Sequence, residues 1–282
     1  HGKFRRQRQM CIRDRHLRQF FMRLITHGCR GSIPTPSKKM QKYGGNTTCF
    51  ELQFDKFQIF FDTGSGFQNA SLESNKEILI FFSHFHHDHI QGLAFNKYLL
   101  ASETKTCISS ALANSENLNK ILRYYFSGDY FPLDLFENLG NVTFSDFTVT
   151  QKSLRDHFRI EAIKLAHPGG SFGYSVMTDK KKFVFLCDNE FTTSQSEELK
   201  KFVEKADVVI WDGMFTKEEL QTKAGWGHSS IEQGIDFFST VNCGQIIISH
   251  HAPYRTDAEL DKINQSLPYG FQLAKDGHVL GL

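Results

Sequence analysis

The sequence lacks several features that would place it in other classes of protein. No run of about 18 apolar residues occurs among its 282 residues, so no membrane span and no membrane partner are expected. Its six cysteines form no C-x-x-C pair and follow no secretory signal, which favours reduced, mostly buried thiols in a cytoplasmic protein. No repeat, linker or low-complexity stretch divides the chain. With 40% hydrophobic residues and 28 Phe, it is long enough to bury a large core.

The first 21 residues almost lack acidic side chains. They carry seven basic residues against Asp14 alone, a net charge of +6, which leaves 26 basic and 30 acidic side chains in residues 22–282, a net charge of −4. A basic arm can bind nucleic acid or a membrane surface. Because position 1 is not Met and Met22 is a natural start, we instead expect residues 1–21 to be a non-native or disordered basic tail. Residues 22–282 are expected to form the functional domain.

What the chain has is a dense group of metal-binding side chains in one short stretch. The motif H-x-H-x-D-H places His84, His86, Asp88 and His89 directly after an apolar strand expected over Glu77–Phe82. Residues two apart at a strand end point to the same side, so the first two histidines can bind one cation. As the chain turns toward a helix, Asp88 and His89 are free to face a second cation. Imidazole and carboxylate are ligands that zinc, manganese and iron accept.

The same arrangement recurs three times further along the chain. Expected strands run into His167, into Asp188 and into His250, and His251 is an alternative to His250. Taken alone, each has a simpler interpretation as a turn histidine, a helix N-cap or a half-buried core residue. Because sites in layered folds gather at one edge of the sheets, their shared position at strand ends indicates one site with ligands for two metal ions.

The remaining pattern predicts two sheets with helices outside them. Short strands with tight turns in the first half favour antiparallel pairing, and strands alternate with helices later. We expect helices over Gly92–Leu100 and over Glu116–Tyr125, the second capped by Ser115, and a strand over Thr143–Thr150. The irregular aromatic stretch Ser127–Gly140 is expected to roof a pocket.

These motifs resemble the metallo-β-lactamase superfamily, and the resemblance runs from Met22 to the C-terminus. It implies an αββα sandwich with a dinuclear metal site at one edge. The metal ligands implied by position are His84, His86 and His167 for one ion, Asp88, His89 and His250 for the other, and Asp188 as a bridge between them. Asp62, in the sequence FDTG, matches a buried Asp that supports the ligands from behind.

A finer resemblance is to the phosphodiesterase branch, which holds ribonuclease Z-like and phosphoribosyl cyclic phosphodiesterase-like enzymes. It is carried by GCRGSIPTPS, YGGNTT, HPGGSFGY, LCDNE and GWGHSS. In that branch the His of the GHS motif, here His228, faces the scissile phosphate and is not a metal ligand. Ribonuclease Z carries a long tRNA-binding arm between its third His and its bridging Asp. In this chain only 20 residues separate the matching His167 and Asp188. Since the body is also net acidic, we expect a small phosphodiester substrate, cyclic or linear, and no nucleic-acid partner.

The implied reaction is hydrolysis at two divalent ions, most simply Zn²⁺, with Mn²⁺ or Fe²⁺ as alternatives. A hydroxide shared by the ions attacks phosphorus, Asp88 orients or deprotonates the water, and His228 stabilises the transition state or protonates the leaving oxygen. The alternative function is hydrolysis of a thioester or lactone, because enzymes of the glyoxalase II type use similar metal ligands. A non-hydrolytic metal or redox-sensing module is the third hypothesis. The GWGHSS motif favours the phosphodiesterase. The oligomeric state is open, and a homodimer is compatible with the sequence.

Overall fold

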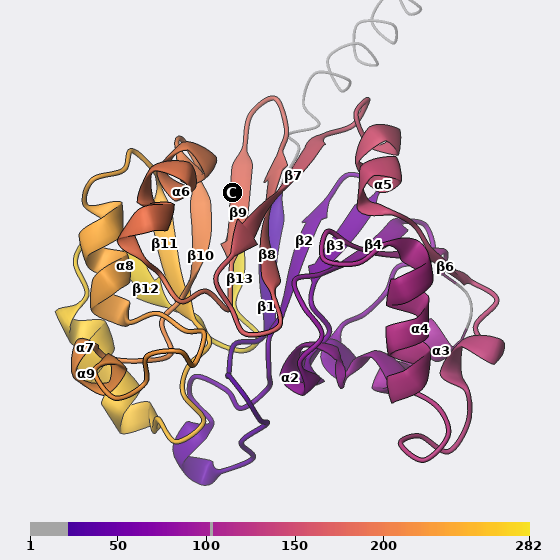
Figure 1. Cartoon of the computed structure of the whole chain (residues 1–282), viewed down its shortest axis with the longest axis horizontal. Coiled ribbons are helices and arrows are strands. Elements are labelled where there is room, and N and C mark those ends of the chain that lie inside the picture. The colour runs from indigo at the N-terminus through magenta and orange to yellow at the C-terminus, as the bar shows by residue number, and fades with distance from the viewer. Residues whose placement is uncertain (1–21, 102–103) are drawn as a thin grey trace, which may run out of the picture.

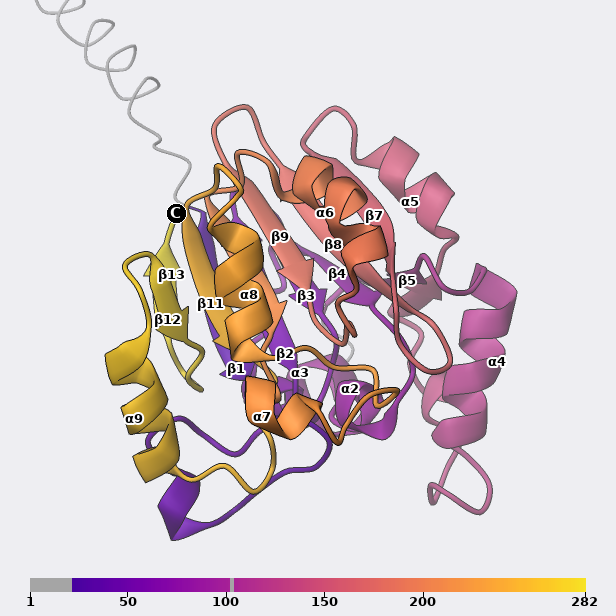
Figure 2. The same cartoon turned by 60° about the vertical axis from the view of Figure 1, so that its left-hand side comes forward.

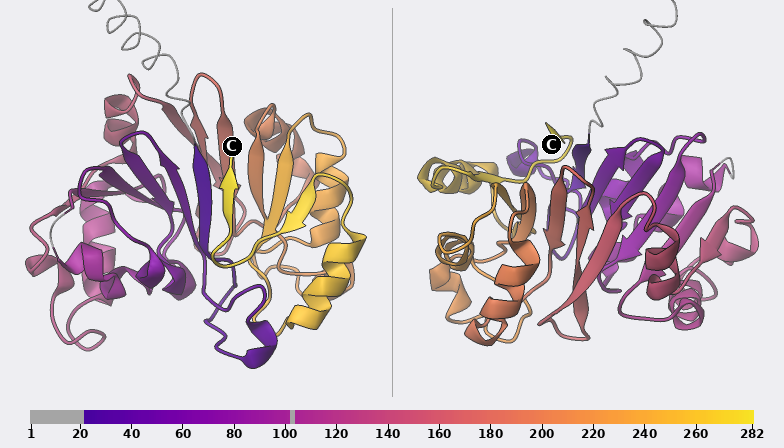
Figure 3. Two further views of the ribbon diagram at one scale, coloured as in Figure 1. Left: turned by 180° about the vertical axis from the view of Figure 1, so that it is seen from behind. Right: turned by 90° about the horizontal axis from the view of Figure 1, so that it is seen from above.

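Two β-sheets packed face to face form the centre of the molecule, and helices cover the outer face of each. The computed structural model describes residues 22–101 and 104–282. Seen from above, the layers run helices, sheet, sheet, helices (Figure 3). The expected αββα architecture is therefore confirmed. The predicted basic tail over residues 1–21 lies outside the described residues.

The first sheet has seven strands in the order β13-β1-β2-β3-β4-β5-β6. Its strands are β1 (Arg23–Gly28), β2 (Cys49–Phe54), β3 (Phe57–Phe61), β4 (Glu77–Phe82), β5 (Thr106–Ser110), β6 (Val142–Phe144) and β13 (Val279–Gly281). Strands β1, β2 and β3 pair antiparallel, as their short turns predict, whereas β3, β4, β5 and β6 pair parallel.

The second sheet has six strands in the order β12-β11-β10-β9-β8-β7. Its strands are β7 (Arg159–Leu165), β8 (Ser171–Met177), β9 (Lys182–Leu186), β10 (Val208–Asp212), β11 (Gln245–Ser249) and β12 (Phe271–Leu273). Strands β7, β8 and β9 form an antiparallel meander, and β9 to β12 are parallel. The parallel strands of both sheets thus deliver their carboxyl ends to one edge of the sandwich, the lower edge in Figure 1.

The helices divide between the two outer faces (Figures 1 and 2). On the side of the first sheet lie α2 (His87–Ile90), α3 (Lys97–Leu100), α4 (Ser115–Tyr125) and α5 (Phe147–Ser153). On the side of the second lie α6 (Ser196–Val203), α7 (Lys217–Leu220), α8 (Ile231–Phe238) and α9 (Asp257–Ser266). The apolar stripe of α4 packs Leu118 and Leu122 on the first sheet. Within the described ranges, no helix has the length and apolar character needed to cross a membrane.

Aromatic side chains fill the space between the sheets. Phe61 lies with its ring centroid 5.4 Å from that of Phe185 on the facing sheet, and Phe81 lies 5.6 Å from Tyr174. Every position of β3 is buried, because one face meets this core and the other meets the helices. Each fully buried ring contributes about 1.5–3 kcal/mol relative to an exposed one, which explains the use of so many Phe residues. The five cysteines in the described ranges are free thiols, as predicted.

The strand predicted over Thr143–Thr150 is wrong. Only β6 is extended, and α5 begins immediately after Asp146. The carbonyl of Asp146 accepts the N–H groups of Val149 and Thr150, which starts the helix, while its carboxylate accepts the N–H of Ser115 from the neighbouring helix. These contacts with a distant segment override the β-branched residues that suggested a strand.

Two predicted helix ends also differ. The side chain of Asn114, one residue before Ser115, accepts the Asn117 N–H at 2.9 Å and is the N-cap of α4. The helix expected over Gly92–Leu100 is interrupted by Asn96, whose side chain accepts the N–H groups of Tyr98 and Leu99 and starts α3. A short 3₁₀ turn precedes it.

Candidate metal centre

Side chains at the ends of several strands meet at the lower edge of the sandwich. Asp62 directly follows β3, and His250 directly follows β11. Asp188 follows β9 with one residue, Cys187, between them. All three have left-handed backbones, with φ of 60°, 59° and 59°. That conformation costs a non-glycine residue roughly 1–2 kcal/mol, so the fold holds these turns in place by its surrounding contacts.

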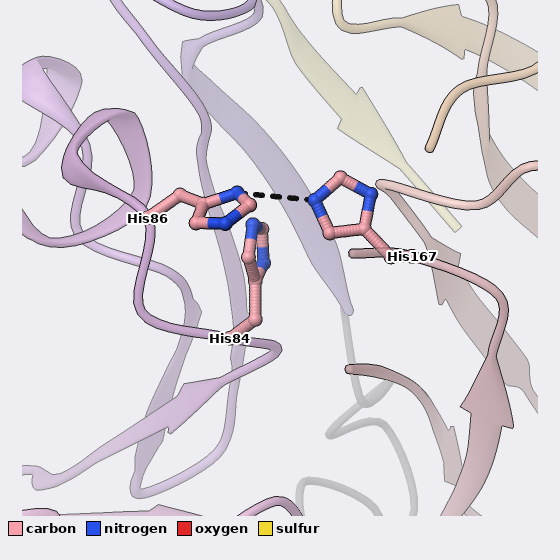
Figure 4. A group of neighbouring side chains, drawn as sticks. All are labelled: His84, His86 and His167. Carbon is pink, nitrogen blue, oxygen red and sulfur yellow. Dashed lines mark hydrogen bonds between the residues drawn. The ribbon is translucent and has the colours of Figure 1, made fainter. Parts of the chain in front are cut away.

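The first group of candidate ligands joins the two sheets (Figure 4). His84 and His86 come from the loop after β4, and His167 comes from the turn between β7 and β8. One nitrogen from each lies within 4.8 Å of the others, and His86 Nδ1 and His167 Nε2 are 3.1 Å apart. The other nitrogen of His167 donates to the Gly227 carbonyl at 2.8 Å, which leaves Nε2 free to bind a cation.

The second group lies deeper and consists of Asp88, His89 and His250. Asp88 Oδ2 is 3.4 Å from His89 Nε2 and 3.8 Å from His250 Nε2. Behind them, the Asp62 carboxylate accepts His89 Nδ1–H at 2.8 Å, and Thr48 Oγ1 lies 3.1 Å from His250 Nδ1. Such contacts orient histidines so that the opposite nitrogen faces a metal. Asp62 therefore occupies the supporting position expected for it.

Asp188 lies between the two groups. Its Oδ1 is 3.2 Å from His89 Nε2 and 3.2 Å from His250 Nδ1. Its Oδ2 is 3.6 Å from His84 Nε2 and 3.7 Å from His167 Nε2. Each carboxylate oxygen of Asp188 therefore faces a different group of histidines.

Buried polar atoms without partners show that these residues fit divalent cations. Within the part of the chain that the structure describes, four such atoms point into the centre: His84 Nε2, His89 Nε2, His250 Nε2 and Asp188 Oδ1. An unsatisfied buried polar atom costs about 1–3 kcal/mol, so four in one place need a common explanation. Two cations would satisfy all four, and this imidazole and carboxylate set accepts Zn²⁺, Mn²⁺ or Fe²⁺.

The protonation of two of the candidate histidines favours ligation, whereas Asp188, Asp88 and Asp62 outweigh burial and raise the pKa of His89 in the metal-free site. Burial lowers the pKa of His84 and of His250, so both rings are neutral and offer a lone pair. Burial alone would raise the pKa of Asp88, but His89 and His250 outweigh it and lower that pKa. Burial raises the pKa of the Cys187 thiol, whose sulfur lies 3.6 Å from His250 Nδ1, and this keeps it a weak ligand.

The choice between His250 and His251 is decided by the fold. His251 points away from the centre, where its Nε2 donates to the Ala274 carbonyl at 3.0 Å and its ring meets the edge of Tyr43. Burial, reinforced by the positive charge of Arg30, lowers its pKa to about 3. His251 is a neutral core residue, and only His250 joins the candidate ligands.

His228 lies beside the two groups and is not one of the orphaned ligands. Its Nδ1 donates to Asp212 Oδ2 at 2.8 Å and lies 3.9 Å from Asp188 Oδ2. Burial alone would lower its pKa, but Asp212, with help from Asp188 and Asp88, raises it to about 9. Sequence reasoning missed the role of Asp212, although it ends β10 just as the other site residues end their strands.

A second residue missed by sequence reasoning is Glu190, which holds the loop that carries His228. Its two carboxylate oxygens accept the N–H groups of Gly225 and Gly227 at 2.8 and 2.9 Å. Gly227 has φ of 86°, and a Cβ there would lie 2.3 Å from His167 Nδ1. The loop can therefore approach His167 only because this residue is glycine.

Comparisons with known proteins identify a family and a fold for this chain. Residues 58–251 match the protein family described as the Beta-lactamase superfamily domain. A curated relative, ribonuclease Z of Thermoplasma acidophilum, is 23% identical over 85% of this chain and 89% of its own length. The solved metallo-beta-lactamase fold protein YhfI from Bacillus subtilis superposes with a TM-score of 0.68 at 19% identity and covers 94% of this chain and 100% of its own. A diphosphatase from the PhnP family gives a TM-score of 0.65 at 17% identity, with 93% and 98% covered.

Proposed function

Because the chain belongs to the beta-lactamase superfamily, we propose that this metal-dependent hydrolase cleaves a small phosphodiester at a centre of two divalent cations. The observation that carries the proposal is the position of Asp188, whose two carboxylate oxygens each face a different group of histidines beside His228. Similarity to a ribonuclease Z and to a PhnP-family diphosphatase supports cleavage of a phosphate ester or anhydride.

The proposed ligands are those implied by the sequence. His84, His86 and His167 would hold one cation and Asp88, His89 and His250 would hold the other, with Asp188 between the two groups. When bound, two divalent cations neutralise the phosphate oxygens and lower the pKa of water toward neutrality. The Asp88 carboxylate, which accepts the Ser32 N–H at 2.7 Å, would orient the attacking water and accept its proton.

His228 supplies the acid for the leaving group in this proposal. Its hydrogen bond to Asp212 fixes the ring and holds the proton on Nδ1, so Nε2–H is left to face the substrate. A pKa of about 9 keeps the ring protonated at neutral pH. Bound cations would lower this pKa toward the working pH, where proton donation to the leaving oxygen is most effective.

The size of the substrate follows from the segment between His167 and Asp188. That segment consists of β8, β9 and their short turns, and no arm extends from it. A small phosphodiester is therefore our first candidate. Because curated relatives are named ribonuclease Z, RNA is the second candidate, and the expectation of no nucleic-acid partner stays a prediction. The cytoplasmic location and the homodimer also stay predictions.

A substrate panel with matched variants tests the proposal. Zinc- or manganese-loaded protein is offered bis-p-nitrophenyl phosphate, a glutathione thioester and a short RNA. We expect phosphodiester cleavage, with turnover lowered about 10²- to 10⁴-fold in His228→Ala at unchanged metal content. The control His157→Ala removes an exposed histidine outside the site and should leave turnover unchanged. Thioester cleavage that exceeds phosphodiester cleavage and is insensitive to His228→Ala would refute the proposal.

A further inference from the structure

A cavity of about 520 Å³ lies against α2, on the side of that helix that His87 faces. Five aromatic side chains line it: Phe95, Tyr125, Phe126, Tyr130 and Phe131. The last two belong to the stretch 127–140 that the sequence predicts to roof a pocket, and in Figure 1 this segment forms the loop below α4. None of these aromatic residues takes part in the candidate metal centre.

The aromatic rings form a wall with flat faces left open. Phe131 packs edge-on against Phe126 and Phe95, with ring centroids 5.7 and 6.0 Å away. Tyr125 meets the ring of His87 at 4.9 Å. Phe95 and Tyr130 are 61% and 65% exposed, so their surfaces are available to a ligand. Aromatic side chains gathered around one cavity of this size are typical of a site for a planar ring.

Polar groups on the same cavity argue against an acyl chain as its occupant. The Gln91 side chain donates to Thr47 Oγ1 at 3.1 Å, which leaves its carbonyl oxygen for a ligand. The side chains of Gln68 and His87 make no hydrogen bond within residues 22–101 and 104–282, and both line the cavity. A hydrocarbon chain would bury these groups unpaired, whereas the edge of a nucleobase offers donors and acceptors to match carboxamides.

None of the seven candidate ligands lines the cavity, and the link between the cavity and the candidate metal centre is His87 in the chain. His87 stands between His86, of the first ligand group, and Asp88, of the second. Consecutive Cα atoms are about 3.8 Å apart, so the wall of the cavity lies one residue from each group. We propose that this aromatic cavity binds the base of a nucleoside phosphodiester whose phosphate lies at the metal centre. The inference rests on the proposed function and narrows its substrate class.

A pair of cyclic phosphates tests the inference. A nucleoside 2′,3′-cyclic phosphate and glycerol 1,2-cyclic phosphate present the same five-membered phosphodiester, with and without a base. In the metal-loaded full chain, Phe95→Ala and Tyr130→Ala should each lower kcat/KM for the nucleoside about 5- to 150-fold, the range that stacking on one base supports. Turnover of the glycerol ester should stay within about twofold. The control Tyr269→Ala removes a fully exposed aromatic outside the cavity and should change neither.

Binding of adenosine, which has no phosphate, separates this inference from the proposed function. Calorimetric titration should show adenosine binding that Tyr130→Ala weakens and Tyr269→Ala does not. If adenosine binds in this way but neither cyclic phosphate is cleaved, the cavity assignment holds and the proposed function fails. If both esters are cleaved equally well and the cavity variants alter neither, the inference is overturned while the proposed function holds. The inference is also overturned if the protein prefers an acylated phosphodiester to the nucleoside ester and if Phe95→Ala and Tyr130→Ala abolish that preference.

Discussion

Replacement of Asp212 by Asn removes a charge from the site with little change of shape. Asp212 Oδ2 accepts His228 Nδ1–H at 2.8 Å, and both groups are buried. That carboxylate is the main reason why the pKa of His228 is raised to about 9 despite burial. Without the charge, we expect the pKa of His228 to fall to about 6.5 or below, a change of roughly 2.5 units or about 3 kcal/mol.

The pH dependence of kcat measures this change. If protonated His228 donates to the leaving oxygen, activity falls as pH rises through its pKa, so this residue sets the alkaline limb. In Asp212→Asn that limb should move to lower pH by about two units, and activity at pH 8 should fall accordingly. Bound cations lower the pKa in both proteins, so the difference between them is the quantity to compare.

Asp207→Asn is the matched control, because the same substitution is made at the other end of β10. Asp207 pairs with Lys181 at 2.8 Å on the surface, far along the strand from the metal ligands. Its profile should match the wild type. An alkaline limb that stays in place in Asp212→Asn, with metal content unchanged, would refute the assignment of His228 as the acid.

The same pair predicts a pH-dependent stability of the metal-free protein. A histidine whose folded pKa is raised stabilises the fold fully below its unfolded pKa of about 6.5, and the contribution is lost as pH rises through the folded value. For His228 that window runs from about 6.5 to about 9. Urea unfolding at pH 6 and pH 9.5 should show a loss of about 3 kcal/mol that Asp212→Asn largely lacks. Equal losses in both proteins would contradict the pairing.

Three further substitutions test the ligands, the loop and the core. His86→Ala should reduce bound metal below the proposed two ions per chain and lower thermal stability. Elemental analysis that finds as much metal as in the wild type would contradict its role as a ligand. Gly227→Ala should displace His167, because a Cβ there lies 2.3 Å from its Nδ1. Gly225→Ala carries similar backbone strain, with φ of 83°, but has open space around its Cβ, so it should reduce metal binding and activity less than Gly227→Ala. Phe61→Ala should cost about 3–5 kcal/mol in urea unfolding, because its ring is fully buried between the sheets. A cost below about 1 kcal/mol would show that the core relaxes around the cavity.

The H-x-H-x-D-H loop could be predicted from the sequence because its chemistry is local. His84, His86, Asp88 and His89 lie within six positions, so the local turn from β4 into α2 brings them together. His167 needed a further step, since it lies on the other sheet. The rule that strand ends share one edge supplied that step, and the structure brings His167 to 3.1 Å from His86.

Other members of the site could not be predicted, because their roles depend on contacts between distant segments. Asp212 and His228 are 16 positions apart and meet only where β10 and the loop before α8 converge. Glu190 reaches the glycines of that loop across 35 and 37 positions. In the same way, Asp146 begins a helix where its β-branched neighbours suggested a strand, because it also caps a distant chain segment.

The sequence by itself determined the kind of ligand, the pairing of apolar strands with polar ends and hence the family of folds, because these depend on residue type and on spacing along one strand. Only the tertiary structure decided that His250 and not His251 faces the centre and that Asp212 sets the charge of His228. It also decided that aromatic rings from two separate segments, at 95 and at 125–131, line one cavity with His87. Burial, charge and distance between segments are properties of the packed chain, and no local pattern of residues encodes them.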